Sequence, residues 1–154
     1  MKCSWVLPNL ALGSSPKFDE DFQELKSLKI TAILSLQTDE DRRDGGIEEE
    51  KTAADKAGLT FSSVPITDFN RTELQIRLPA GVAALERLLQ QGHSVYVHCT
   101  AGVNRSPTVV AAYFHWCGGV ELLQVLTHLH VCRDCLPDAD AIHDARRPDA
   151  LESR

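Results

Sequence analysis

The stretch His98-Cys99-Thr100-Ala101-Gly102-Val103-Asn104-Arg105-Ser106-Pro107 lies between a β-rich run and an apolar run that contains no helix breaker. Residues 94–97 predict a short buried strand, and residues 108–116 predict a helix that ends before Gly118-Gly119. Pro107 suits the first turn of this helix, where its missing N–H costs nothing. Strand, tight loop and helix N-terminus in this order predict an anion cradle at the carboxyl end of a strand in an α/β sheet.

The residue types in this loop match the needs of attack on a phosphate monoester. Cys99 supplies a nucleophile, and the field of a helix N-terminus favours its thiolate form. Arg105 can bind two phosphate oxygens with its planar guanidinium, and the Ser106 hydroxyl can help the sulfur to leave. Gly102 allows a backbone conformation that a β-carbon forbids. We expect phosphate to be bound by the amides of Thr100, Ala101, Gly102, Val103, Asn104 and Arg105.

The motif H-C-x5-R-S resembles the active-site loop of the protein tyrosine phosphatase superfamily, and H-C-T-A-G-V-N-R-S-P-T resembles that of its dual-specificity branch. The resemblance implies an α/β fold with a central mixed, mostly parallel sheet flanked by helices. It implies a phosphocysteine intermediate on Cys99, no cofactor and no metal. It also implies that His98 supports the loop.

In this branch an aspartate that precedes the cysteine, in a loop between a strand and a helix, acts as general acid and then as general base. Asp68 occupies the matching position, after a strand predicted at residues 60–64. We therefore assign Asp68 to acid and base catalysis. A helix cap is its alternative role, although Asn70 and Thr72 are equally suitable caps.

The order of motifs from Asp68-Phe69 through residues 74–79 and the cysteine loop to residues 133–137 is similar to that of glucan phosphatases. That group contains the plant starch phosphatases and laforin. Phe69 is the candidate substrate contact, where an aromatic ring can stack on a sugar or a tyrosine. Two features differ from the group: Asn104 replaces its usual glycine, and residues 39–46 are charged and contain no aromatic. We interpret the charged run at residues 39–50 as a solvated loop and helix face.

The sequence favours a dual-specificity phosphatase that acts on phosphotyrosine and phosphoserine/phosphothreonine proteins. A glucan phosphatase acting on a starch-like or glycogen-like substrate is the alternative. A non-catalytic phosphate-binding module and a rhodanese-like sulfurtransferase are further alternatives, but the module would be expected to lack Cys99, Arg105 or Asp68, and the sulfurtransferase has no need of Asp68.

A chain of 154 residues with 43% hydrophobic residues suits one domain, which we place at residues 1–146, followed by a flexible tail at 147–154. The net charge of −6 argues against nucleic-acid binding and against attraction to anionic membranes. We expect no membrane span, and the sequence does not indicate an oligomeric state.

The five cysteines, one of them a candidate thiolate, favour the reducing cytoplasm. Cys132 and Cys135 have the spacing of a metal or redox pair, but without a second such pair we predict no metal site. The remaining secondary structure is predicted as two short strands within residues 5–14, a strand at 30–36, and helices at 19–28, 47–57, 74–89, 120–131 and 138–145.

Overall fold

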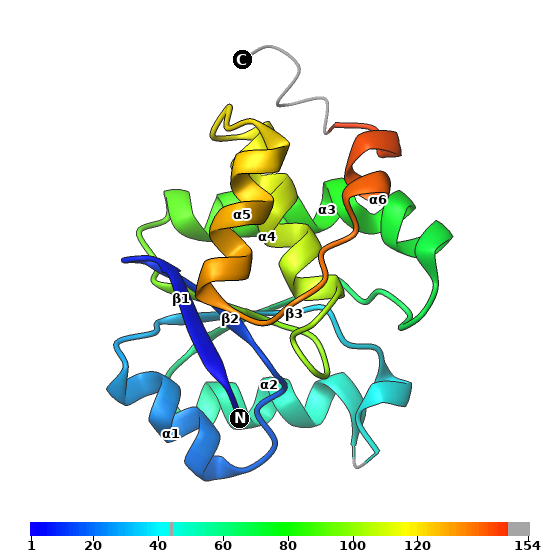
Figure 1. The fold of residues 1–154 in the computed structure, drawn as a ribbon. Coiled ribbons are helices and arrows are strands. Elements are labelled where there is room, and N and C mark those ends of the chain that lie inside the picture. The colour runs from blue at the N-terminus through cyan, green and yellow to red at the C-terminus, as the bar shows by residue number, and fades with distance from the viewer. Residues whose placement is uncertain (44, 148–154) are drawn as a thin grey trace.

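The computed structural model describes residues 1–43 and 45–147, and it places a five-stranded sheet between two layers of helices (Figure 1). The strands are β1 (Cys3–Leu7), β2 (Leu10–Gly13), β3 (Ala32–Ser35), β4 (Thr60–Ser63) and β5 (Val95–His98). The helices are α1 (Asp19–Ser27), α2 (Gly46–Lys56), α3 (Arg71–Gln90), α4 (Arg105–Trp116), α5 (Leu122–Cys132) and α6 (Ala139–Asp144), with a 3₁₀ turn η1 (Asp39–Asp41). Of the tail expected at 147–154, all but Arg147 lies outside the described residues.

The strands lie in the order β1-β2-β5-β3-β4. Only β1 runs antiparallel, to β2, and the other pairs are parallel. The mixed, mostly parallel sheet expected from the sequence is therefore confirmed. The central strands β3 and β5 are buried along their whole length, as strands covered on both faces must be. Because β5 is central, the loop that follows it leaves the middle of the sheet.

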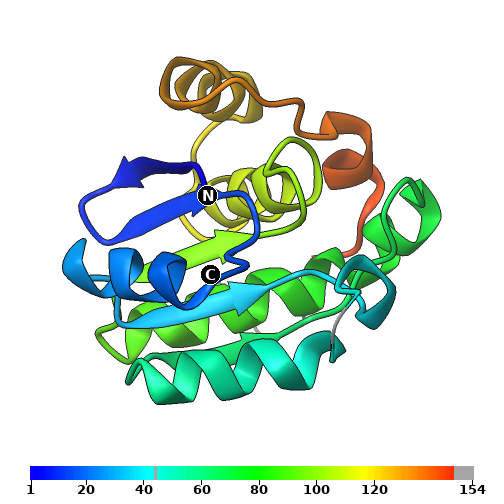
Figure 2. The same cartoon turned by 90° about the horizontal axis from the view of Figure 1, so that it is seen from below.

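Helices α3, α4, α5 and α6 cover one face of the sheet, and α1 and α2 cover the other (Figures 1 and 2). Successive side chains of a strand point to opposite faces. Leu34 and Val97 accordingly belong to the core beneath α3–α6, whereas Ile33 and Tyr96 belong to the core beneath α1 and α2. Both cores contain side chains of β5, so packing on both faces fixes the position of the strand that carries the candidate loop.

Helices α3 and α4 each begin three residues before the predicted start. Helix α4 starts at Arg105 rather than residue 108, because the loop closes directly onto its first turn. Helix α3 starts at Arg71, after Asn70, whose side chain accepts a hydrogen bond from the Glu73 amide at 2.9 Å. This cap contributes about 1 kcal/mol to a helix start. It leaves Asp68 outside the helix.

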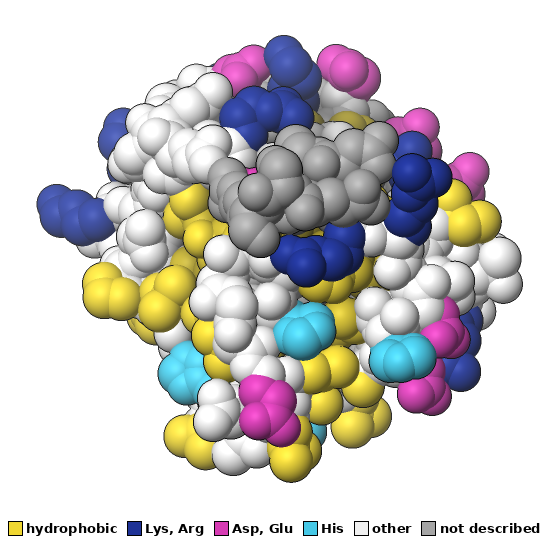
Figure 3. Space-filling model, turned by 90° about the horizontal axis from the view of Figure 1, so that it is seen from above, with side chains coloured by type: hydrophobic (Ala, Val, Ile, Leu, Met, Phe, Trp, Pro, Cys, Tyr) yellow, Lys and Arg dark blue, Asp and Glu magenta, His cyan; other side chains and the backbone are white. Residues whose placement is uncertain are grey.

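The face formed by α3–α6 mixes positive and negative side chains and shows no large region of one sign (Figure 3). Within the described part of the chain, no helix has both the length and the hydropathy needed to cross a bilayer.

Candidate active site

Cys99 follows β5 directly, at the start of a loop that leads into α4. Its side chain is buried, and its Sγ lies 3.3 Å from the Ser106 hydroxyl in the first turn of α4. The sequence predicted this pairing. A hydroxyl at this distance can donate to a thiolate and stabilise it as a leaving group.

The carbonyl oxygens of the loop, from Cys99 to Asn104, all accept hydrogen bonds. In loop order their donors are His98 Nδ1 (3.0 Å), the Ser15 amide (3.0 Å), Arg133 Nη2 (3.0 Å), Arg133 Nε (2.8 Å), the Leu136 amide (2.7 Å) and the Thr108 hydroxyl (2.7 Å). These donors come from elements on several sides of the loop. Together they fix the direction of each peptide group.

The amides of the same loop are left available. No carbonyl or side chain among the described residues accepts a hydrogen bond from the N–H groups of residues 100–105. Successive free amides at a helix N-terminus form an anion-binding concavity. Gly102 makes the curve possible with φ of +71°, and Gly13 packs against it so closely that a β-carbon would lie 2.5 Å from the Gly13 carbonyl carbon.

Arg105 is buried and extends its guanidinium beneath the loop. Nη1 donates to Asp41 Oδ2 at 2.7 Å and to the Ile66 carbonyl at 2.8 Å. Nη2 donates to the Thr100 hydroxyl at 3.1 Å and lies 3.2 Å from Asp68 Oδ2. Nε is buried and has no partner among the described residues. Nη1 is thus fully engaged, and an anion that bound both Nε and Nη2 would have to displace Asp68 from Nη2.

Asp68 and Phe69 form the rim above Arg105. The Asp68 side chain is one-third exposed, and its Oδ1 accepts the Phe69 amide at 3.1 Å. Phe69 is fully exposed and adopts φ of +57°, a conformation rare for a residue with a large side chain. A hollow of about 400 Å³ lies beside them, lined also by Asn104 and Leu136. An exposed ring at its edge suits contact with a ligand rather than a role in the core.

A buried ion-pair network supports the loop from behind. His98 Nδ1 donates to the Cys99 carbonyl, while its Nε2 contacts a carboxylate oxygen of Glu50. Arg42 Nη1 lies 3.4 Å from the other oxygen of Glu50. Burial opposes ionisation of Glu50, but the charge and hydrogen bond of His98 and the charge of Arg42 outweigh it and hold the pKa of Glu50 below its usual value. Gln37 connects this network to the loop by donating to the Thr100 hydroxyl at 3.0 Å.

The interpretation of residues 39–50 as a solvated face is wrong for three residues. Arg42 and Glu50 are buried, and Asp41 pairs with Arg105. Asp39 and Glu40 are exposed as expected, and Asp44 lies outside the described residues. Asp41 and Arg42 lie at the end of η1 and just after it, on the segment that leaves β3, and β3 ends beside β5 because the two strands pair in parallel. Glu50 lies further along the chain, in α2, where its charge alone gave no sign of burial.

Arg71 follows the acid loop and makes ion pairs with Asp138 at 2.7 Å and Asp140 at 3.3 Å. Within the part of the chain that the structure describes, the two cysteines with metal or redox spacing form no such ion pair. Cys135 is buried, and Cys132 Sγ lies 3.8 Å from His128 Nε2. The described residues contain no group of three or more side chains suited to a metal ion.

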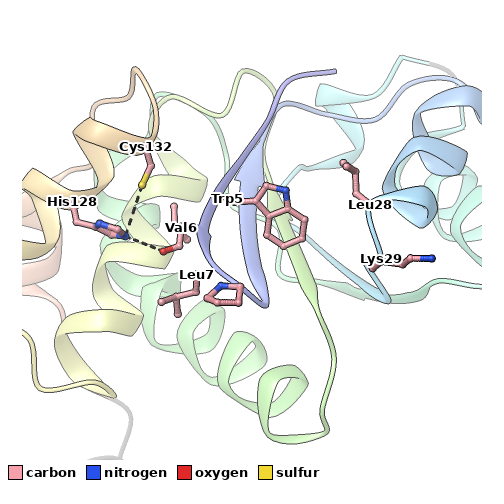
Figure 4. A pocket seen from close by; sticks show the side chains of 8 residues that line it. Trp5, Val6, Leu7, Leu28, Lys29, His128 and Cys132 are labelled. Carbon is pink, nitrogen blue, oxygen red and sulfur yellow. Dashed lines mark hydrogen bonds between the residues drawn. The ribbon is translucent and has the colours of Figure 1, made fainter.

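A second hollow, of about 510 Å³, lies between β1, the end of α1 and α5, and its walls include Trp5, Leu28 and His128 (Figure 4). It sits at the amino ends of the parallel strands, whereas Cys99 lies at the carboxyl ends. It therefore takes no part in the candidate site, despite its larger volume.

The family model described as "Dual specificity phosphatase, catalytic domain" matches residues 10–138. The chain belongs to the dual specificity phosphatase family. The resemblance inferred from the loop motif is thereby confirmed.

Two relatives of this dual specificity phosphatase domain cover most of its length. Phosphoglucan phosphatase DSP4, amyloplastic, of Castanea sativa is 35% identical over 149 residues, which cover 92% of this chain and 39% of the relative. Laforin of Mus musculus is 33% identical over 161 residues, which cover 96% of this chain and 49% of the relative. The chain thus spans less than half the length of either protein.

Among solved structures, kinase associated phosphatase (KAP) superposes with a TM-score of 0.74 at 18% identity, over 92% of this chain and 90% of that chain. This likeness confirms the fold.

Gly102→Ala is expected to disrupt the loop for two reasons. The new β-carbon would strain the backbone at this positive φ, and it would force Gly13 to move. Gly119→Ala is the matched control: its φ is +66°, but no atom lies within 4 Å of the added carbon. We expect Gly119→Ala to lower the free energy of unfolding by about 1–2 kcal/mol, the cost of the backbone strain alone. Gly102→Ala should lower it by more. Urea unfolding of both variants measures this. Equal losses would contradict the close approach of Gly13.

Glu50→Gln is expected to lower stability at neutral pH by about 3–5 kcal/mol, the usual cost of breaking a buried pair. Because the pKa of Glu50 is lowered on folding, its ionised form contributes stability above pH 4.5, its usual pKa, and this contribution is lost as pH falls further. The difference in unfolding free energy between wild type and Glu50→Gln should therefore shrink below pH 4.5. Exposed Glu48 on the same helix provides the control Glu48→Gln, and a pH-independent difference would contradict the account.

Proposed function

We propose that this domain hydrolyses phosphomonoesters with Cys99 as nucleophile and Asp68 as general acid. One observation carries the proposal: the loop that begins at Cys99 leaves the amides of residues 100–105 and the Nε of Arg105 without an acceptor, as an anion cradle requires. Such a cradle neutralises a phosphate dianion, which otherwise resists an anionic nucleophile. The cysteine, arginine and acid roles are those expected from the sequence.

In the first step the Cys99 thiolate attacks phosphorus, a sulfur–phosphorus bond forms and the phosphorus–oxygen bond to the leaving group breaks. Asp68, entering protonated, transfers its proton to the leaving oxygen. Arg105 and the amides hold the three non-bridging oxygens. Before phosphate arrives, Asp68 Oδ2 lies 3.2 Å from Nη2 of Arg105. When phosphate engages Nη2 it displaces this contact, and the freed carboxylate takes up a proton from solvent and turns toward the leaving oxygen.

In the second step Asp68 accepts a proton from water, and the water oxygen attacks phosphorus. The sulfur–phosphorus bond breaks and inorganic phosphate is released. The thiolate leaves with a hydrogen bond from Ser106, which lies 3.3 Å from its sulfur. The cycle contains no oxidation or reduction, and every group in it belongs to the chain, the substrate or water.

For the substrate, the dual-specificity motif supports phosphotyrosine and phosphoserine/phosphothreonine proteins, as the sequence favoured. A specific observation supports a phosphoglucan instead: a relative named as a phosphoglucan phosphatase is 35% identical over 92% of this chain. The fully exposed Phe69 beside a hollow next to Asp68 suits stacking on a sugar ring. We place the phosphoglucan first, since it accounts for both features.

Hydrolysis of para-nitrophenyl phosphate in the presence of a chelator tests the reaction. We expect Cys99→Ser to abolish turnover, because a serine hydroxyl is not ionised at neutral pH. Asp68→Ala should lower kcat by about 10²-fold or more, the usual contribution of a general acid. Cys132→Ser, a cysteine away from the site, is the matched control. Turnover by Cys99→Ser would exclude this mechanism and favour a binding module.

Phosphate release from phosphorylated starch or glycogen, set against a panel of phosphopeptides, separates the two substrate classes. If the phosphoglucan is the substrate, Phe69→Ala should lower kcat/KM on the glucan about tenfold, through loss of ring stacking. Ile76→Ala, which removes an exposed apolar side chain from α3, serves as the control. Faster turnover of phosphopeptides by wild type would restore the protein substrate to first place.

A further inference from the structure

We propose that Glu50 is a positioning residue that acts through His98: it holds the ring of His98 as an imidazolium and thereby sets the pH at which Cys99 becomes a thiolate. The inference rests on the proposed function, which makes Cys99 the nucleophile. It concerns a residue of α2 that the loop motif does not contain.

Both ring nitrogens of His98 face oxygen atoms that accept hydrogen bonds. Nδ1 lies 3.0 Å from the Cys99 carbonyl oxygen, and Nε2 contacts a carboxylate oxygen of Glu50. A neutral imidazole carries one N–H and donates to only one acceptor, whereas an imidazolium donates from both nitrogens. An ionised Glu50 therefore requires the charged form of the ring.

The surroundings of Glu50 keep its carboxylate ionised. Arg42 Nη1 lies 3.4 Å from the second carboxylate oxygen, and a guanidinium stays charged throughout the physiological pH range. Burial alone would favour the neutral acid, but His98 and Arg42 outweigh it and hold the pKa of Glu50 below its usual value. The carboxyl group thus has no proton to donate to Nε2, and the ring supplies that proton itself.

The other polar groups around this pair support the same charges. Tyr96 stacks on His98 with the ring centroids 5.9 Å apart, and burial raises the pKa of its hydroxyl, which therefore stays neutral. The Ser35 hydroxyl of β3 favours the ionised form of Glu50. Glu49 pairs at 2.9 Å with the other terminal nitrogen of the arginine. Among the described residues, no further charged side chain forms an ion pair with the imidazole or with its carboxylate partner.

The order of these charges determines the effect on Cys99. The ring of His98 lies between the Glu50 carboxylate and the Cys99 peptide, so the positive charge is nearer to the loop than the negative charge. A positive charge nearby favours a thiolate. If Glu50 acted on the sulfur by its own charge, its removal would favour ionisation. If it acts by keeping His98 charged, its removal disfavours ionisation, because an unpaired buried imidazolium loses its proton.

The pH dependence of Cys99 alkylation by iodoacetamide tests this sign, because the thiolate is the reactive form and no turnover is needed. The extent of alkylation is read from the mass of the peptide that contains Cys99. We expect Glu50→Gln, which keeps the size of the side chain and removes its charge, to raise the midpoint by about one pH unit, the low end of what a neighbouring charge produces. Glu50→Asp restores a carboxylate and should recover part of the shift. Glu49→Gln removes the other carboxylate that pairs with the same arginine and is the matched control, with an unchanged midpoint.

A lower midpoint in Glu50→Gln would overturn the inference, because it indicates a direct effect of the carboxylate charge. An unchanged midpoint would also overturn it, because it indicates a role in packing alone. Nitrogen-15 NMR of the His98 ring in wild type needs no variant to fold: we expect a proton on both nitrogens at neutral pH, and a single ring proton would overturn the inference. A wild type that gives both expected results but hydrolyses no phosphomonoester would overturn the proposed function only.

Discussion

The hydrogen bonds that hold the carbonyl oxygens of residues 99–104 are the interactions on which the site depends. A peptide group has its N–H and its C=O on opposite sides, so binding the oxygen sets the direction of the N–H in the next residue. Because every carbonyl in the loop has a donor, the amides are oriented before any ligand is present. Preorganised dipoles of this kind need no reorganisation when charge develops, which is why they contribute much to catalysis.

The rest of the fold supplies those donors. Strand β5 brings Cys99 to the middle of the sheet edge, and the second residue after β2, Ser15, contributes its amide. The residue after α5, Arg133, binds two successive carbonyls and also the Ser4 hydroxyl of β1 at 3.1 Å. It thus ties an edge strand to the loop. On the buried side of the loop, Glu50 of α2 pairs with His98 and Arg42 and so connects α2 to the start of the loop.

The elements around Cys99 were predictable from the sequence because they depend on residues that are neighbours in the chain. The strand, loop and helix around Cys99 are contiguous in the sequence. Their hydrophobic periodicity and the proline and glycine residues at their boundaries therefore predict them directly. Asp68 and Phe69 were found because they follow a recognisable strand in a familiar order. Asp41, Glu50 and Arg133 were not found, because their roles depend on which strand ends meet at one edge. From sequence alone a charged side chain is predicted to be solvated, because the buried partner that would neutralise it is known only once the strand order is known.

The central claim is that Cys99 forms a covalent bond to the phosphoryl group, and trapping that species tests it most directly. Wild type and the Asp68→Ala variant would be mixed with para-nitrophenyl phosphate, quenched in acid within one turnover and examined by peptide mass spectrometry. The account predicts one added phosphoryl group on the peptide that contains Cys99, and more of it in Asp68→Ala, which hydrolyses the intermediate slowly. Release of nitrophenol with no phosphoryl group on Cys99 at any time of quenching would contradict the account.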